Sequence, residues 1–162
     1  MTIHWIFDVD DTLYQLKKRK PHFDYRDIRH DPYLRNLING LPGTKHIFSN
    51  SMMVHSKRIV NKQGINKIFS PHRIYTRDKM GVIKPNKYSY SYVMNKVKPK
   101  NNDYLVFFDD RDENLEMAKK HGWVTVSINP KPKNHLSFVD LSFPNIHRAL
   151  NFFSSVKNRR RM

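Results

Sequence analysis

The sequence predicts a three-layer α/β/α sandwich of the Rossmann type, built on a central parallel sheet. Short apolar runs that end at an acid or a serine are typical of strands buried on both faces, and they occupy residues 3–8, 46–48 and 104–108. Segments with a helical spacing of apolar residues separate these runs. Strands that alternate with helices in this way indicate a parallel sheet covered by helices on both faces.

The helix boundaries follow from local start and stop signals. Asp31 and Pro32 are typical of a helix cap and a first helical residue, and Gly40 ends the apolar face that follows them. Further helices are expected over residues 52–63, 86–96, 112–121 and 145–153. In the second of these, the spacing predicts that Tyr88 and Tyr92 face the core. The remaining segments are expected to be one or two short strands in 65–75, a polar loop over 76–85 and a strand over 123–128.

Length and composition favour one domain. The chain has 162 residues, of which 38% are hydrophobic and 12% aromatic, and this composition argues against a disordered protein. We expect a single domain over residues 1–154, with a basic insert or vestigial cap at 15–30, followed by a basic tail over 155–162. The chain contains no cysteine, which excludes disulfides, thiolate zinc sites and cysteine nucleophiles.

The net charge of the chain indicates what kind of partner it binds. Thirty Lys and Arg residues against 14 Asp and Glu residues give a net charge of +16, which raises the local concentration of nucleic acids, nucleotides and phosphoproteins. No apolar run approaches the roughly 18 residues that a membrane span needs. Acids within the apolar N-terminal segment argue against a signal peptide. We expect a cytoplasmic or nuclear protein with no membrane partner, and the oligomeric state stays open.

Several of the few acids form two tight groups, each directly after an apolar strand. The groups are Asp8, Asp10 and Asp11, and then Asp109 and Asp110. Carboxylates gathered at strand ends repel one another, and an apolar setting makes them costly unless a cation neutralises them. Mg²⁺ prefers such oxygen ligands. The alternative is that these acids cap helices or pair with Lys and Arg, but the repetition of the pattern after two strands favours a metal site.

Four short motifs occur in order between residues 3 and 128. They are Asp8-Val9-Asp10-Asp11-Thr12 and Ser49-Asn50, each after an apolar strand, then Lys84-Pro85 before a helix, and finally Asp109-Asp110 with Asn114 behind it. In this order the motifs resemble those of the haloacid dehalogenase-like (HAD) phosphohydrolases. The resemblance implies a HAD-like fold and the hydrolysis of phosphate esters.

The resemblance also implies a role for each motif residue. Asp8 is expected to be the nucleophile that forms an aspartyl-phosphate. Asp10 is expected to protonate the leaving oxygen and then to activate water, with a pKa raised by neighbouring carboxylates. Lys84 would clamp the phosphoryl group, which Ser49 and Asn50 would also bind. The implied cofactor is Mg²⁺, held by Asp8, the backbone carbonyl of Asp10, Asp109 and Asp110. The histidines show no metal-ligand spacing and are expected to be core or surface residues.

The motifs look most like those of the branch that contains pyrimidine 5′-nucleotidase-like enzymes. Many relatives carry a cap domain that closes over the substrate. Here residues 12–49 leave room for only a helix and a short insert, so we expect no cap or a vestigial one at 15–30. In the family, capless members often act on large substrates.

The insert is a candidate polyanion-binding element. It contains the basic run Lys17, Lys18, Arg19 and Lys20, and the aromatic residues Phe23 and Tyr25 follow it. Basic residues interleaved with aromatic ones suit a phosphate backbone with bases that can stack, as at the end of a nucleic acid strand. The alternative is a solvated charged loop. For the basic tail, three interpretations stay open: a nucleic-acid arm, a nuclear signal and a solvated terminus.

The sequence as a whole favours a Mg²⁺-dependent phosphomonoester hydrolase that acts through Asp8 on a nucleic acid end or a nucleotide. A phosphoprotein phosphatase and a phosphotransferase are alternatives within the same chemistry. A HAD-fold protein that binds nucleic acid without catalysis is the alternative from another class. Dehalogenation is disfavoured because it does not require the second group of acids.

Overall fold

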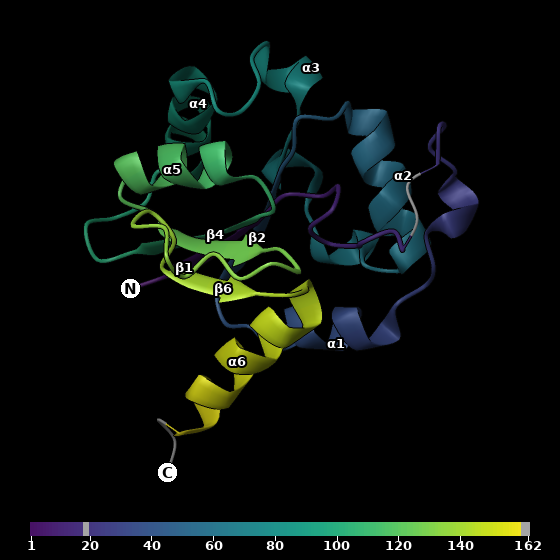
Figure 1. Ribbon diagram of the computed structural model, residues 1–162. Coiled ribbons are helices and arrows are strands. Elements are labelled where there is room, and N and C mark those ends of the chain that lie inside the picture. Colours follow the sequence, from purple (N-terminus) through teal and green to yellow (C-terminus); the bar gives the residue numbers. More distant parts are fainter. Residues whose placement is uncertain (18–19, 160–162) are drawn as a thin grey trace.

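The computed structural model describes residues 1–17 and 20–159, with side chains through residue 156, and it contains one six-stranded sheet (Figure 1). The strands are β1 (Ile3–Phe7), β2 (Thr44–Phe48), β3 (Ile74–Tyr75), β4 (Tyr104–Asp109), β5 (Val124–Ile128) and β6 (Leu141–Phe143). Their order in the sheet is β3-β2-β1-β4-β5-β6, and every neighbouring pair is parallel. The predicted parallel sheet is confirmed.

Helices cover both faces of the sheet, which confirms the three-layer architecture (Figure 1). One face packs against α1 (Pro32–Gly40), α2 (Met53–Gln63) and α6 (Ile146–Arg159). The other packs against α4 (Lys87–Val97) and α5 (Asp112–Lys120). The short helical segments are α3 (Arg77–Met80) and the 3₁₀ turns Tyr25–Asp27, Asn66–Ile68 and Pro71–Arg73.

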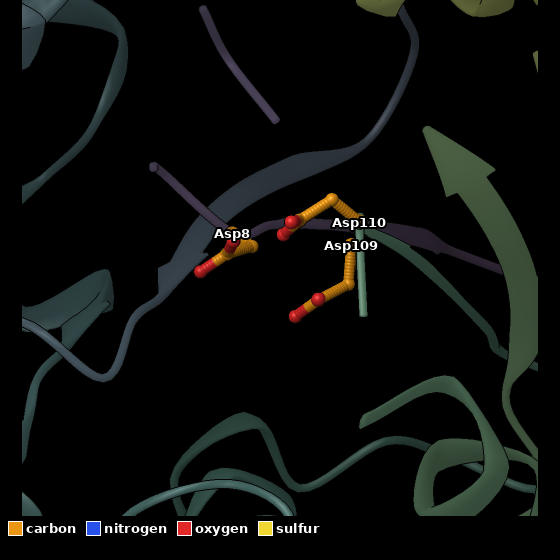
Figure 2. A group of neighbouring side chains, drawn as sticks. All are labelled: Asp8, Asp109 and Asp110. Atoms are coloured by element: carbon orange, nitrogen blue, oxygen red, sulfur yellow. The ribbon is translucent and has the colours of Figure 1, made fainter. Parts of the chain in front are cut away.

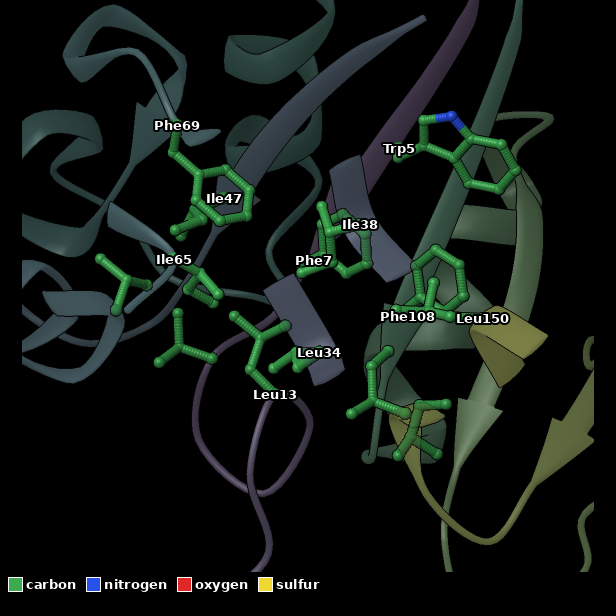
Figure 3. Packing of buried hydrophobic residues seen from close by; sticks show 14 of the residues in the cluster. Trp5, Phe7, Leu13, Leu34, Ile38, Ile47, Ile65, Phe69, Phe108 and Leu150 are labelled. Carbon is green, nitrogen blue, oxygen red and sulfur yellow. The ribbon is translucent and has the colours of Figure 1, made fainter. Parts of the chain in front are cut away.

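Side chains that alternate along the central strands fill both layers of the core. Phe7 and Phe108 stack with their ring centroids 4.8 Å apart on the side of α1 and α6, as Figure 3 shows. Ile6 and Phe107, one residue away on the same strands, are buried on the side of α4 and α5. Burial of successive residues on opposite faces explains why these strands are continuous apolar runs. The same packing fixes the positions at which β1 and β4 end.

The predicted start and stop signals act as expected at α1 and α2. The Asp31 carboxylate accepts a hydrogen bond from the Leu34 backbone N–H at 2.8 Å, and Pro32 opens the helix. Gly64 ends α2 with a φ of 75°, a left-handed conformation that costs glycine little.

The inner face of α4 differs from the prediction. Tyr88 is 63% exposed, whereas Tyr90 is fully buried and its hydroxyl donates to the backbone carbonyl of Asn114 at 2.7 Å. Tyr92 is half-buried against Tyr75. The prediction for Tyr88 is therefore wrong, because the stripe that faces the sheet runs through residues 89, 90 and 93. Helical spacing allowed either stripe, and the contacts of the Tyr90 ring with Phe48 and Phe107 of the sheet select the one that contains Tyr90.

Three further boundaries depart from the sequence expectation. The segment 65–75 is mostly 3₁₀ turn and contributes only the two-residue strand β3, while the predicted loop 76–85 contains α3. Strand β6 was not expected. Helix α6 continues to Arg159 rather than ending at residue 153, since no glycine or proline interrupts it and Phe153 packs edge-on against Trp5 at 5.1 Å. Arg160, Arg161 and Met162 of the predicted tail lie outside the described residues.

The insert between β1 and α1 is tied to the domain at both ends by one residue. The Gln63 side-chain amide donates to the Leu13 carbonyl at 2.8 Å, and the Gln63 carbonyl accepts from the Asp31 N–H at 3.0 Å. Between these ties, the described residues form one 3₁₀ turn, so this part of the chain contains no cap domain. Among the described residues, no helix is long and apolar enough to cross a membrane.

Candidate active site

The candidate site lies where the direction of the chain through the sheet reverses. From β1 the chain proceeds outward through β2 to β3, and it then returns to the other side of β1 to form β4. Open parallel sheets bind ligands at the carboxyl ends of the strands beside such a switch point. Asp8 directly follows β1, and Asp109 ends β4 with Asp110 next to it. The topology therefore brings the two predicted groups of acids together.

Asp8 is a buried carboxylate held from three sides. Its backbone N–H donates to the Phe108 carbonyl at 2.9 Å, which extends the pairing of β1 with β4 by one residue. Its Oδ2 accepts from the Thr12 hydroxyl at 3.2 Å, and its Oδ1 accepts from the Lys84 Nζ at 2.9 Å. Burial raises the pKa of Asp8 well above its ordinary value, although Lys84 opposes this shift.

Lys84 joins the two groups of acids. Its Nζ donates to Asp8, to Asp109 Oδ2 at 2.7 Å and to the Phe48 carbonyl at 2.7 Å, which uses all three of its protons. Burial opposes the charge of Lys84, but the carboxylates of Asp109 and Asp8 outweigh it and raise the pKa of the lysine. Lys84 is therefore a charged, immobilised ammonium at the floor of the site.

Asn50 holds the backbone of Lys84. Its side-chain Oδ1 accepts from the Lys84 N–H at 2.7 Å, and its Nδ2 donates to the Lys84 carbonyl at 3.0 Å. Such a paired amide contact fixes the place at which the lysine enters the site. A phosphate contact by Asn50 stays a prediction, and what the structure shows is this positioning contact.

Asp109 is fully buried and well supplied with donors. The Arg111 N–H donates to its Oδ1 at 2.9 Å, and the Asn114 side-chain amide contacts both of its oxygens at 3.1–3.2 Å. Asp110 has no Lys or Arg within ion-pair distance in the described part of the chain. Burial, the Asp109 carboxylate and Asp11 raise the pKa of Asp110 to about 7. The site therefore holds three carboxyl groups against the one charge of Lys84, and the ionised forms of Asp8 and Asp110 are disfavoured without a further cation.

The three carboxylates fit a divalent metal ion. Asp8, Asp109 and Asp110 each offer one oxygen, and these oxygens lie within 4.8 Å of one another. Figure 2 shows the Asp110 side chain turned toward Asp8 across the ends of the two strands. An all-oxygen, mainly anionic donor set suits Mg²⁺. The Asp10 side chain is not part of this group, and a metal contact through the Asp10 backbone carbonyl stays a prediction.

Ser49 lies at the end of β2, next to β1. Its backbone N–H donates to the Tyr75 carbonyl at 2.9 Å. Its hydroxyl oxygen is 2.7 Å from that of Ser51 and accepts from the Ser51 N–H at 3.1 Å. The Ser51 hydroxyl contacts that of Ser56 in turn, at 2.8 Å. A row of hydroxyls that can rotate their protons therefore begins at the predicted phosphate-binding serine.

Asp10 has an environment that the sequence did not predict. Its Oδ1 accepts hydrogen bonds from the Tyr14 hydroxyl and from His55 Nε2, the latter at 2.8 Å. Burial raises the pKa of Asp10, but the hydrogen bonds from His55 and Tyr14 outweigh burial, so the pKa lies below its ordinary value. The expectation of a raised pKa is therefore wrong for the protein without substrate. The cause is a pair of donors rather than neighbouring carboxylates.

Comparison with known proteins shows which known fold the chain has. No protein-family model and no curated protein matches the sequence. Solved structures do match, and the three named here are 15–16% identical to this chain. They include the magnesium-bound HAD-hydrolase YfnB from Bacillus subtilis (TM-score 0.63) and the L-2-haloacid dehalogenase of Xanthobacter autotrophicus with chloropropionic acid covalently bound (0.62). A HAD phosphatase from Thermococcus onnurineus also matches (0.56). The chain has the haloacid dehalogenase-like fold.

The matched structures are longer than this HAD-like domain. Each alignment covers 75% of this chain but only 54%, 60% and 55%, respectively, of the three structures. The chain therefore spans little more than half the length of these HAD-fold neighbours. The pyrimidine 5′-nucleotidase-like branch stays a prediction.

His55 is the residue that the sequence analysis missed in the HAD-like site. It was expected to be a core or surface residue because it has no neighbouring histidine or cysteine. The available signal was its place in the first turn of α2, the helix that begins after Ser49 at the carboxyl edge of the sheet. Tyr14, which lies two residues after the first motif, was assigned no role.

The basic run of the insert is only partly described. Lys18 and Arg19 lie outside the described residues. Lys20 pairs with Asp27 at 2.8 Å, so its charge is partly neutralised within the insert. Lys17 and Lys20 line a cleft of about 850 Å³ that extends from the Thr12–Tyr14 turn to the start of α6. Polyanion binding by this run stays a prediction.

Proposed function

We propose that the chain is a Mg²⁺-dependent phosphomonoester hydrolase that acts through an aspartyl-phosphate on Asp8. The observation that carries this proposal is the contact of one buried lysine with two carboxylates from different strands, Asp8 and Asp109. Oxygens of the two groups of acids lie within 4.8 Å of one another, where a divalent ion fits. The fold, shared with HAD phosphatases and hydrolases, supports the same conclusion.

The contacts of Asp8 suit a nucleophile. One of its oxygens is held by Lys84 and the other by Thr12, so the carboxylate is oriented before a substrate arrives. In the first step, an Asp8 oxygen forms a bond to phosphorus while the bond from phosphorus to the leaving oxygen breaks. The Lys84 ammonium offsets the negative charge that gathers on the phosphoryl oxygens.

The residues that would hold Mg²⁺ are Asp8, Asp109 and Asp110, together with the backbone carbonyl of Asp10. When bound, the ion would supply the positive charge that allows an anionic carboxylate to approach an anionic phosphate. Asp109 itself is kept in place by Asn114 and by the Arg111 N–H. Its position is therefore set by the protein rather than by a ligand.

Asp10 is the acid and base of the proposed reaction. Because the contacts of His55 and Tyr14 lower the pKa of Asp10, the proposal requires that this carboxylate takes up a proton when the phosphate enters the site. The protonated carboxyl then gives this proton to the leaving oxygen as the phosphorus–oxygen bond breaks. The resulting carboxylate then takes a proton from water, whose oxygen attacks the aspartyl-phosphate. This second step releases inorganic phosphate, restores Asp8 and returns the proton to Asp10.

We favour the end of a nucleic acid strand, or a nucleotide, as the substrate. The net charge of +16 supports an anionic partner larger than one phosphate. The described residues contain no cap domain to enclose a small ligand, and the cleft beside the first motif is lined by Lys17, Lys20, Arg26 and Arg29. The cleft shares Thr12 with the site but is not lined by Asp8, Lys84 or Asp109, so we assign it to the remainder of a long substrate and not to the reacting phosphate.

The first test is phosphate release from an aryl phosphate, with and without Mg²⁺. We expect Mg²⁺-dependent turnover that falls at least about 1,000-fold in Asp8→Asn, because the nucleophile is lost. The matched control is Asp11→Asn, which makes the same chemical change at an adjacent position. Asp11 has a φ of 58°, which asparagine tolerates well, so its variant should keep near-full activity. Equal turnover in the wild type and Asp8→Asn would overturn the mechanism.

The second test concerns the substrate. A 5′-phosphorylated oligonucleotide should be hydrolysed with a kcat/KM that falls steeply as salt rises, whereas a mononucleotide should show little salt dependence. A phosphopeptide of matched length provides the comparison with phosphoprotein substrates. Equal salt dependence for oligonucleotide and mononucleotide would contradict the preference for a nucleic acid end.

A further inference from the structure

The two hydrogen bonds to Asp10 reach the same oxygen. Tyr14, from the turn that follows the first motif, and His55, from α2, both contact Oδ1. In the described part of the chain, no hydrogen bond reaches Oδ2. A protonated carboxyl group has one carbonyl oxygen, which accepts, and one hydroxyl, which donates. The two donors on Oδ1 favour the ionised carboxylate. When Asp10 takes up a proton, the same donors make Oδ1 the accepting oxygen and leave Oδ2 to carry the proton that is transferred.

The orientation of the His55 ring is set from its other nitrogen. The Tyr25 hydroxyl lies 2.7 Å from His55 Nδ1 and makes no other hydrogen bond with a described residue. If the phenol donates to Nδ1, the proton of the neutral ring is on Nε2, which then donates to Asp10. The other neutral tautomer would set two accepting atoms, Nε2 and the carboxylate oxygen, against each other at 2.8 Å. The Asp10 carboxylate thus requires the proton on Nε2, and the Tyr25 hydroxyl favours this tautomer by donating to Nδ1.

Aromatic packing holds this arrangement in place. The Phe23 ring packs edge-on against His55 at 5.0 Å and against Tyr25 at 4.9 Å. The guanidinium of Arg58, one turn along α2 from His55, lies over the Tyr25 ring at 3.8 Å. The described part of the insert is thus packed on α2, and the polar end of the packed cluster points to Asp10.

We propose that His55 is a positioning residue for Asp10, and that the insert serves to hold it. Tyr25 and Phe23 fix the imidazole, and the Nε2 proton of His55 together with the Tyr14 hydroxyl fixes Oδ1. The free Oδ2 faces the leaving group, gives its proton to the leaving oxygen and later takes one from water. His55 keeps its own proton throughout. This inference rests on the proposed phosphatase function and assigns the insert a role in proton transfer.

The test compares substrates whose leaving groups differ in their need for a proton. A dinitrophenolate leaves without protonation, whereas an alkoxide does not. The relevant quantity is kcat/KM, because it reports the steps up to the formation of the aspartyl-phosphate. In His55→Phe we expect kcat/KM for an alkyl phosphate to fall about 100-fold, the lower end of the usual contribution of general acid catalysis. For dinitrophenyl phosphate it should change less than about threefold.

Matched variants separate positioning from folding. His55→Gln keeps an N–H donor at a similar reach and should recover much of the alkyl phosphate activity. Tyr25→Phe keeps the ring but loses the hydroxyl, and its smaller loss should show the same dependence on the leaving group. His72→Phe is the control, since His72 is an exposed histidine away from the site, with a ring nitrogen 2.9 Å from the Ser70 hydroxyl. Thermal unfolding of each variant reports whether the fold is intact.

Nitrogen NMR of the histidine side chains gives a readout without turnover. The wild type should show His55 protonated on Nε2, and Tyr25→Phe should shift the population toward the other tautomer. An unchanged tautomer in Tyr25→Phe would overturn the role of Tyr25.

The outcomes distinguish the two proposals. If the wild type hydrolyses neither substrate, the phosphatase function fails and this inference falls with it. If the wild type is active but His55→Phe loses both activities equally, or neither, the function stands and the positioning role is overturned.

Discussion

Two clusters of buried polar side chains lie on the same sheet and differ in charge. The acidic cluster is Asp8, Asp109 and Asp110 with Lys84, at the carboxyl ends of β1 and β4. The histidine cluster is His4, His46, Thr44 and Tyr75, on the side of β1 and β2 that faces α4. Its imidazoles contact each other at 3.2 Å, and the second lies 3.2 Å from the Tyr75 hydroxyl.

This difference in charge shows which kind of buried polar cluster indicates a ligand. Burial, then the neighbouring His4, Arg73 and His72, lower the pKa of His46 to about 3, so its ring is neutral and its hydrogen bonds are made within the cluster. The acidic cluster holds three carboxyl groups against one lysine, and burial raises the pKa of Asp8 and raises that of Asp110 to about 7. A cluster that satisfies itself stabilises the fold, whereas one whose ionised groups are disfavoured is a candidate cation site.

Removal of Lys84 should have the largest effect. In Lys84→Met, Asp8 and Asp109 face each other without a counter-charge, so we expect the free energy of unfolding to fall by about 3–5 kcal/mol and turnover to be lost. Chemical denaturation and the aryl phosphate assay measure the two effects. Lys87→Met, at an exposed lysine, is the control. An unchanged stability would show that the carboxylates are already neutral or hydrated.

Magnesium should stabilise the protein through the acidic cluster. At 100 times the dissociation constant, binding adds about 2.7 kcal/mol to the free energy of unfolding. We expect Asp110→Asn to lose this gain, whereas His46→Phe should keep it. Without Mg²⁺ at pH 8, Asp110→Asn should be more stable than the wild type by about 1–2 kcal/mol, because the raised pKa shows that the charged form is disfavoured in the folded state. Thermal unfolding with Mg²⁺ or with EDTA measures both differences in stability. If Mg²⁺ does not change the unfolding temperature of the wild type, the metal site is contradicted.

The histidine cluster should make the stability of the protein depend on pH in the acidic range. The unfolded chain protonates His46 below about pH 6.5, whereas the folded protein does so only near pH 3. The stability from the neutral ring is therefore complete above pH 6.5 and is lost as the pH falls toward 3, by at most about 1.4 kcal/mol per pH unit. Urea denaturation at several pH values should show a shallower decline in His46→Phe. Parallel curves would mean that the folded state accepts the proton.

The exposed charges of the insert should have the smallest effects. Lys17→Ser and Lys20→Ser should leave the hydrolysis of small substrates and the free energy of unfolding nearly unchanged. If each lysine contacts a phosphate of a single-stranded substrate, each change should reduce the slope of log affinity against log salt by about 0.7. Binding to a labelled oligonucleotide over a salt series measures the slope. An unchanged slope for both variants would mean that neither lysine contacts the nucleic acid, and it would leave the insert only its proposed role in holding His55.

The fold and the acidic cluster were predictable because both depend on local signals along the chain. An apolar strand that stops at Asp8 or Asp109 places the acid at the carboxyl edge, and parallel strands bring such edges together. The resemblance of four motifs to one family added Lys84. These inferences required only that the strands enter the same sheet.

The rest depended on tertiary packing. Tyr88 and Tyr90 lie on alternative stripes of one helix, and the packing of Tyr90 against Phe48 and Phe107 of the sheet decides between them. The pKa of Asp10 depends on His55, which is 45 residues away in the sequence. The neutral state of His46 depends on its burial beside His4. No local pattern reports such contacts.

The tie made by Gln63 determines where this domain can vary. Because one residue bonds to the Leu13 carbonyl and to the Asp31 N–H, the two ends of the insert are held together whatever its length. Doubling the length of a flexible loop costs only about 0.6 kcal/mol of closure entropy. The sheet would therefore tolerate a longer or shorter segment here. A different insert would lack Tyr25 and Phe23, which pack against His55, and so would alter the hydrogen bonding of Asp10. Changes in the insert can therefore alter activity while the fold stays the same.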